Sequence, residues 1–224
     1  MKPQKAMILA AGRGERMRPL TDTIPKPLIK VGDRPLIQHH IEALVRAGIQ
    51  DLVINHAHLG DKIETSLGDG SHFGCHISYS AEGHGQALET GGGIFKVIGH
   101  FDNLPFLVVN GDIWTDMEYA DLTIEDDVDA HLVMVNNPAH NPEGDFVLKD
   151  HRLIEHGSTK LTFSGIGIYH PRLFEGCQPG RFPLAPLLKQ AIARGRVSAE
   201  KYSGRWIDVG TPERLETINR LLSQ

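Results

Sequence analysis

Short apolar runs alternate with helical patterns along the first half of the chain. The apolar runs predict buried strands at Lys5 to Ala10, Asp51 to Asn55, Ile77 to Ser80 and Leu104 to Val109. Apolar residues at helical spacing predict a helix that begins at Pro35 and ends at Gly48, and a second from Leu59 to Leu67. This alternation of strands and helices predicts an α/β fold, with a mostly parallel sheet covered by helices on both faces.

The second half of the chain has a less regular pattern. It predicts strands at Asp129 to Val135, Phe146 to Lys149, Leu153 to Ile154 and Leu161 to Tyr169, and helices at Leu184 to Ala193 and Pro212 to Leu222. No internal repeat or linker divides the chain. We therefore predict a single domain over residues 1–224, in which residues 138–224 form a smaller part that covers a pocket.

Composition excludes several classes of protein. A net charge of −5 over 224 residues gives no basic field that would attract nucleic acid. No apolar run is long enough for a signal sequence or a membrane span. The two cysteines, Cys75 and Cys177, form no CxxC pair, which argues against a disulfide framework or a zinc site. We expect a cytoplasmic protein, monomeric or a small homo-oligomer, with neither nucleic acid nor membrane as a partner.

The loop after the first strand carries the strongest chemical signal. Residues 9–21 are Leu-Ala-Ala-Gly-Arg-Gly-Glu-Arg-Met-Arg-Pro-Leu-Thr, and Pro-Lys-Pro follows at 25–27. Small residues let backbone N–H groups approach phosphates, and Arg16 and Lys26 would add charge-assisted contacts. Met17 stands where a dinucleotide fingerprint needs its third glycine, and the Gly-Lys-Ser/Thr of a Walker loop is absent. The loop thus predicts a phosphate site of another kind.

Three further motifs lie near predicted element ends. The Asn-Gly-Asp of residues 110–112 follows an apolar strand, where Asp112 would suit Mg²⁺ or would simply close an Asx turn. Thr211 is a suitable N-cap for the last helix. Helix capping gives no reason, however, for an aspartate at position 208 close to Trp206. The Glu-Thr-Gly-Gly-Gly of residues 89–93 predicts a flexible loop before a helix that begins near Ile94.

The loop at 9–21 and the Pro-Lys at 25–26 resemble the signature of sugar-1-phosphate nucleotidyltransferases at every position. The resemblance implies a three-layer Rossmann-like nucleotidyltransferase fold with a mostly parallel sheet and a small sugar-binding subdomain. Residues 1–137 would bind a nucleoside triphosphate (NTP), and residues 138–224 would bind the sugar-1-phosphate and supply the second metal ligand. A nucleotidyl group would pass to the sugar phosphate with Mg²⁺ as cofactor, and pyrophosphate would leave.

The resemblance also implies a role for individual residues. The catalytic residues would be Arg16, Lys26 and Asp112, and the magnesium ligands would be Asp112 and Asp208. The nucleotide would contact Ala10, Ala11, Gly12, Arg13, Gly14, Lys26, Thr90 and Gly91, with Glu82 or Gln86 at the edge of the base. The sugar phosphate would contact Asn110, Gly144, Asp145, Glu155 and Gly165. His156 stands where the family has a lysine that helps hold this phosphate, so either another cation, with Lys160 and Arg205 as the candidates, takes its place or the acceptor binds differently.

Segments 89–96, 109–116 and 164–169 are similar to those of short bacterial members of the family that use UTP and N-acetylmuramic acid α-1-phosphate in cell-wall recycling. This resemblance implies UTP as the nucleotide. A mannose-1-phosphate guanylyltransferase and a phosphocholine cytidylyltransferase are alternatives on the same fold. A non-catalytic nucleotide-sugar sensor is a third, but such proteins tend to lose the charged residues that this chain keeps at 16, 26, 112 and 208.

Overall fold

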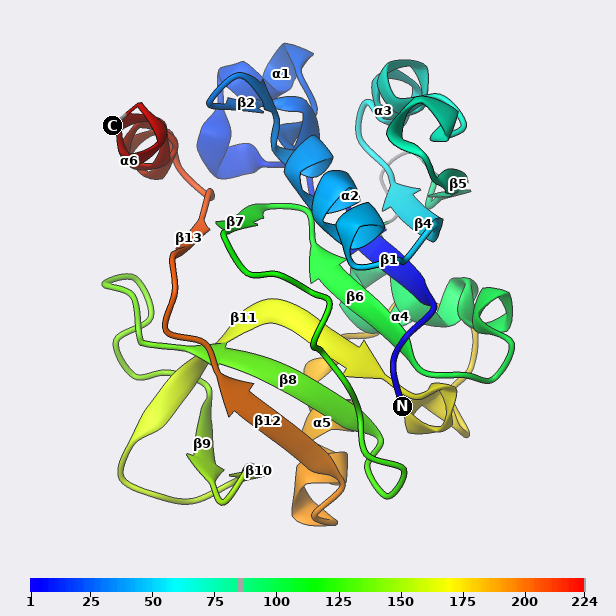
Figure 1. The fold of residues 1–224 in the computed structure, drawn as a ribbon, viewed down its shortest axis with the longest axis vertical. Coiled ribbons are helices and arrows are strands. Elements are labelled where there is room, and N and C mark those ends of the chain that lie inside the picture. Colours follow the sequence, from blue (N-terminus) through cyan, green and yellow to red (C-terminus); the bar gives the residue numbers. More distant parts are fainter. Residues whose placement is uncertain (84–86, 224) are drawn as a thin grey trace.

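A nine-stranded mixed sheet forms the centre of the computed structural model, which describes residues 1–83 and 87–223 (Figure 1). Across the sheet the strands are β5 (His76–Ala81), β4 (Asp51–His56), β1 (Lys5–Leu9), β6 (Phe106–Asn110), β11 (Lys160–Tyr169), β8 (Ala130–Val135), β12 (Val197–Lys201), β10 (Arg152–Ile154) and β9 (Phe146–Lys149). Two small ribbons pair β2 (Lys30–Val31) with β3 (Arg34–Pro35), and β7 (Ile113–Thr115) with β13 (Trp206–Asp208).

Helices cover both faces of this sheet. The α-helices of the described residues are α1 (Leu20–Thr23), α2 (Leu36–Arg46), α3 (Gly60–Leu67), α4 (Glu89–Lys96), α5 (Ala185–Ala193) and α6 (Pro212–Leu222). Side chains alternate across β1, so that Ala6 and Ile8 pack with α2 and α3, whereas Met7 packs with α4 and α5. The two buried cores confirm the predicted three layers. No helix within residues 1–83 or 87–223 is both long and apolar enough to span a membrane.

The sheet is parallel in its first half and mixed in its second. Strands β5, β4, β1 and β6 run parallel, as predicted. Strand β11 runs antiparallel to both β6 and β8, and β9 and β10 form an antiparallel hairpin. Parallel pairing needs a crossover of about a dozen residues or more, which the short link between β9 and β10 cannot supply. The predicted parallel order therefore holds throughout β5, β4, β1 and β6, whereas in the second half of the sheet β12 runs parallel to β8 and the other pairings are antiparallel.

The prediction of a flexible loop at residues 89–93 is wrong, because α4 begins at Glu89. Its glycines serve close packing. A Cβ on Gly91 would lie 2.6 Å from the ring of Phe182, and one on Gly92 would overlap the carbonyl oxygen of Gly180. The N–H of Gly92 donates to the carbonyl oxygen of Phe182 at 3.0 Å. Glycine lowers helix propensity, but here it lets α4 lie directly against the 180–182 backbone.

Candidate active site

Strand register brings several predicted residues to one edge of the sheet. Leu9 at the end of β1 lies level with Asn55 in β4 and Asn110 in β6. Ile166 of the antiparallel β11 pairs with Val109, which places Gly165 beside Asn110. Gly165 has a φ of +82°, and a Cβ there would lie 2.6 Å from Nδ2 of Asn110. Two of the predicted sugar-phosphate contacts are thus brought together by the sheet itself.

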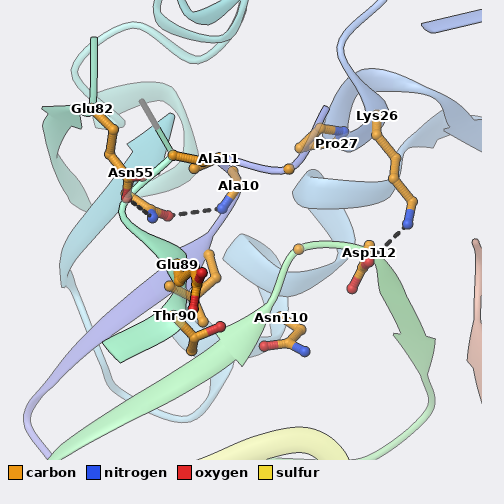
Figure 2. A pocket seen from close by; sticks show the side chains of 14 residues that line it. Ala10, Ala11, Lys26, Pro27, Asn55, Glu82, Glu89, Thr90, Asn110 and Asp112 are labelled. Atoms are coloured by element: carbon orange, nitrogen blue, oxygen red, sulfur yellow. Dashed lines mark hydrogen bonds and ion pairs between the residues drawn. The ribbon is translucent and has the colours of Figure 1, made fainter. Parts of the chain in front are cut away.

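Two adjoining hollows open at this edge. The first, drawn in Figure 2, is lined by Leu9, Ala10, Ala11, Gly12, Lys26, Pro27, Asn55, Glu82, Ala87, Glu89, Thr90, Asn110, Gly111 and Asp112. The second is lined by Gly12, Arg13, Gly14, Glu15, Arg16, Lys26, Asp112 and Gly210. They share Gly12, Lys26 and Asp112, so an extended ligand can occupy both. The first has mostly small or neutral walls, whereas the second is rich in cations.

The predicted nucleotide residues divide between these hollows, with two exceptions. Gly91 packs against Phe182 inside α4 and does not line either hollow. Gln86 lies outside the described residues. The others line one hollow or both, which agrees with their predicted role, although contact with a nucleotide stays a prediction.

A buried hydrogen-bond network supports the wall of the first hollow. Asn55 accepts from the N–H of Ala10 at 2.9 Å and donates to Oε1 of Glu82 at 2.6 Å (Figure 2). The second Glu82 oxygen accepts from the N–H of Leu88 at 2.8 Å. Both carboxylate oxygens of Glu82 therefore accept hydrogen bonds from the protein and stabilise the wall of the hollow. Sequence reasoning missed Asn55; the signal available was a buried-strand residue with an amide side chain at a carboxyl end.

The loop at residues 9–21, called the phosphate loop below, is held closed by a hydrogen bond and by a glycine that its backbone conformation requires. Thr21 donates its hydroxyl to the carbonyl oxygen of Gly14 at 2.9 Å. Gly14 has a φ of +65°, and a Cβ there would lie 2.8 Å from Cγ2 of Thr21. After this turn Lys26 points back toward β6, and its Nζ lies 2.7 Å from Oδ2 of Asp112 (Figure 2). The Lys26 side chain is only 8% exposed, and the carboxylate of Asp112 offsets the cost of burying its ammonium group.

The ribbon of β7 and β13 joins the two predicted metal ligands. Asp208 pairs with Ile113, and the N–H of Val209 donates to the carbonyl oxygen of Asp112 at 2.8 Å. In Figure 1 this ribbon lies between β6 and α6. Two aspartates that are 96 positions apart in the sequence thus lie on directly bonded backbone segments.

The surroundings of Asp208 were not predicted. Its Oδ2 accepts from Nη1 of Arg214 at 2.9 Å and lies 3.3 Å from Nε2 of His140. Its Oδ1 is buried and has no hydrogen-bond partner among the described residues. A buried carboxylate oxygen without a protein partner is costly, so it calls for a water, an ion or a ligand as its partner.

The pair Asp112 and Asp208 fits Mg²⁺. Within residues 1–83 and 87–223, no three His, Cys, Asp or Glu side chains cluster as a complete metal cage. Mg²⁺ commonly binds through one or two carboxylates and completes its shell with water and substrate phosphates. The unpaired Oδ1 of Asp208 and the exposed carboxylate of Asp112 provide that kind of donor set.

A buried histidine supports the turn that carries Asp112. His40 on α2 is fully buried, with Nε2 2.8 Å from the carbonyl oxygen of Ile113 and Nδ1 3.3 Å from the hydroxyl of Tyr119. Burial lowers the pKa of His40 to about 4, so the ring is neutral near pH 7. A neutral ring with its proton on Nε2 donates to the carbonyl oxygen of Ile113 and so fixes the start of β7 against α2.

Asn110 lines the first hollow, whereas the other predicted sugar contacts line neither: Gly144, Asp145, Glu155 and Gly165. Asp145 accepts from the N–H of Phe163 at 2.8 Å and from Nδ2 of Asn141 at 3.1 Å, which fastens β9 to β11. Gly144 beside it has a φ of +64°. Glu155 follows β10 and is exposed. Their contact with a sugar stays a prediction.

The two proposed stand-ins for the absent lysine differ in position. Lys160 begins β11 beside Gly144, where a Cβ on the glycine would lie 2.9 Å from that of the lysine. Arg205 precedes β13, and its N–H donates to Oδ1 of Asp116 at 2.8 Å. Neither side chain lines the described hollows.

Comparison with known proteins places this geometry in a family. The family model described as nucleotidyl transferase matches residues 5–146. An N-acetylmuramate α-1-phosphate uridylyltransferase from Neisseria meningitidis is 49% identical, with 97% of both chains covered. A mannose-1-phosphate guanylyltransferase from Mycobacterium tuberculosis is 29% identical over 93% of this chain and 61% of its own.

Structural comparison agrees. A solved structure from Bacillus anthracis, described as a glucose-1-phosphate thymidylyltransferase, has a TM-score of 0.86 at 23% identity and covers 97% of this chain and 94% of its own. At that identity the likeness establishes the fold, which confirms the predicted nucleotidyltransferase architecture. Together with the matched family model, it shows that the chain belongs to the nucleotidyl transferase family.

Proposed function

We propose that this protein transfers a uridylyl group from UTP to N-acetylmuramic acid α-1-phosphate, giving the UDP-sugar and pyrophosphate. The observation that carries the proposal is the meeting of the Lys26–Asp112 ion pair with Asp208 beside the phosphate loop. The similarity to the uridylyltransferase from Neisseria meningitidis over nearly the whole chain supports the choice of substrates. The lower identity to a guanylyltransferase favours UTP over GTP.

The residues at the site suit this reaction. An oxygen of the sugar phosphate attacks the α-phosphorus of UTP, a new P–O bond forms, and the bond to the β-phosphate oxygen breaks as pyrophosphate leaves. The attacking oxygen is already anionic, so no general base is required. Lys26, Arg16 and the loop N–H groups stabilise the charge on the triphosphate, and the rigid loop holds it in line.

A divalent cation is part of the proposal. Mg²⁺ held by Asp112 and Asp208 would neutralise phosphate charge when bound. The support for it is the donor set described above, in particular the buried Oδ1 of Asp208. A cytoplasmic location and the oligomeric state stay predictions.

A substrate matrix tests the proposed reaction. Purified protein is incubated with Mg²⁺, each of the four NTPs and several sugar-1-phosphates, and pyrophosphate release is measured. We expect the highest kcat/KM for UTP with N-acetylmuramic acid α-1-phosphate. Preference for GTP or CTP would overturn the uridylyltransferase assignment, and binding without turnover of any pair would favour a nucleotide-sugar sensor.

A further inference from the structure

Three charged side chains converge on Gly210, just behind the cation-rich hollow. A Cβ on this buried glycine would lie 2.5 Å from Nη2 of Arg214, 2.7 Å from Oδ1 of Asp208 and 3.1 Å from Nη2 of Arg16. Arg16 comes from the phosphate loop, and Arg214 comes from the first turn of α6. Only a residue without a side chain leaves room for two guanidinium groups and a carboxylate at one point.

This arrangement places two like charges side by side. Guanidinium groups that face one another repel unless an anion lies between or beside them. Asp208 is that anion in the described structure, because its Oδ2 accepts from Nη1 of Arg214 at 2.9 Å. The Arg214 side chain is only 19% exposed, so it is much less hydrated than Arg16, which is exposed.

The hollow in front of Gly210 suits a polyanion. Its lining includes the cations Arg13, Arg16 and Lys26, and Gly210 forms part of the same wall. Arg214 does not line the hollow itself, but its Nη2 lies 2.5 Å from the position that a Cβ on Gly210 would take. An arginine fork grips two phosphate oxygens at once, which a lysine cannot do.

We propose that Arg214 is a further phosphate ligand, which together with Arg16 binds the two terminal phosphates of the nucleotide, the group that leaves as pyrophosphate. Asp208 holds the Arg214 guanidinium when no phosphate is present. A cation on Asp208 would weaken its hold on Arg214 and leave the guanidinium free to turn toward the phosphates. We call Arg16 and Arg214 together the clamp. The identity of the phosphates that it binds rests on the proposed function, whereas the clamp itself rests on the contacts at Gly210.

A simpler role for Arg214 makes a different prediction. If Arg214 only orients Asp208, its loss changes the Mg²⁺ concentration that the enzyme needs but leaves the binding of pyrophosphate at saturating Mg²⁺ unchanged. If it is a phosphate ligand, its loss weakens pyrophosphate binding directly. Binding of inorganic pyrophosphate therefore separates the two roles without any turnover.

The first experiment measures that binding by isothermal titration calorimetry with the full chain, at a Mg²⁺ concentration that saturates every variant. The variants are R214Q and R214K, with R220Q as the control, because Arg220 lies on the same helix, is exposed and pairs with Glu216. We expect R214Q to bind pyrophosphate about tenfold more weakly or worse, R214K to fall between, and R220Q to match the wild type.

R214K also keeps the test decisive if R214Q fails to fold, because it retains a cation beside Asp208 but loses the fork. Wild-type affinity in R214K, or in a folded R214Q, would overturn the proposal.

The second experiment tests the hold of Asp208 on Arg214, with pyrophosphate and no divalent cation. D208N should raise the affinity for pyrophosphate, and the gain should be several-fold larger in the wild-type background than in R214Q. Equal gains in both backgrounds would show that Asp208 does not restrain Arg214.

Failure of the clamp and failure of the proposed function give different results. If the wild type does not turn over UTP but R214Q loses pyrophosphate binding, the clamp is supported and the proposed reaction is contradicted. If UTP is turned over and R214Q binds pyrophosphate with wild-type affinity, the proposed reaction is supported and the clamp is contradicted.

Discussion

Two aspartates at opposite edges of the sheet are both held by arginine, yet their environments differ. Asp129 immediately precedes β8, at the edge where β6 begins; its carboxylate accepts from Nε of Arg172 at 2.6 Å and from Nε and Nη2 of Arg196. Asp208 lies at the edge where β6 ends, and one of its oxygens is buried without a partner among the described residues. Both carboxylate oxygens of Asp129 therefore accept hydrogen bonds, whereas only one oxygen of Asp208 does.

The difference distinguishes a structural carboxylate from a functional one. Every oxygen of Asp129 is engaged, and its arginines tie the starts of β8 and β12 to the 171–174 turn. One carboxylate oxygen of Asp208 makes no hydrogen bond to the described residues and is left for a water, an ion or a ligand. Removal of the charge should therefore lower turnover at Asp208 and the free energy of unfolding at Asp129.

The largest expected effect is on turnover in D208N. Because a neutral amide is a weaker ligand than a carboxylate for the Mg²⁺ that would neutralise phosphate charge, we expect turnover to fall about 10²- to 10³-fold with little change in melting temperature. Pyrophosphate release and differential scanning fluorimetry measure the two. D61N, an exposed position on α3, is the matched control. Turnover within threefold of the wild type would remove Asp208 from the site.

The other half of the site should respond nearly as strongly. K26Q removes the cation that lies 2.7 Å from Asp112, and we expect turnover to fall about 100-fold because charge on the triphosphate is no longer neutralised. K30Q, on the exposed face of β2, is the control. If both variants turn over UTP alike in steady-state assays, Lys26 has no role in the reaction.

The saturated carboxylate should show the reverse pattern. D129N leaves Arg172 and Arg196 without a charged partner, and we expect a loss of about 1–3 kcal/mol in the free energy of unfolding, with turnover at 25 °C unchanged. Urea unfolding followed by circular dichroism measures the loss. D127N, whose carboxylate meets Arg152 at an exposed position, should cost less. A stable D129N with impaired turnover would contradict the distinction drawn here.

The parts of this site that sequence could predict are those encoded locally. The phosphate loop, Asp112 and Asp208 follow from short motifs, and parallel strands necessarily bring their carboxyl ends to one edge. Apolar periodicity likewise predicted the bounds of β9 and α6 as the structure has them. These features depend on neighbours in the chain, which a sequence displays directly.

The rest depends on contacts between distant residues. The ribbon of β7 and β13 has only three residues a side and is held by Asp116, which bonds Tyr202 and the backbone of Arg205. The contact of Arg214 with His140 spans 74 positions. The glycines of α4 suit a loop until the 180–182 backbone is seen against them. Periodicity carries no information on such pairings.

The smallest expected effect concerns acid stability, and it tests whether Asp129 is ionised in the folded protein. Burial alone would raise the pKa of Asp129, but hydrogen bonds from Arg196 and Arg172 outweigh it and hold the pKa below 3.8. The unfolded chain has a pKa near 3.9, so ionised Asp129 stabilises the fold fully above that value and progressively less as pH falls through the lower, folded pKa.

Thermal melts of wild type and D129N from pH 7 to pH 3 check this dependence. We expect a constant difference in melting temperature above about pH 5 and a narrowing difference below about pH 4, because protonation makes Asp129 resemble the neutral amide. A difference that persists unchanged at pH 3 would mean that the arginines are held by geometry rather than by charge. Asp129 would then resemble a saturated polar group more than an ion, and the contrast with Asp208 would rest on hydrogen bonding alone.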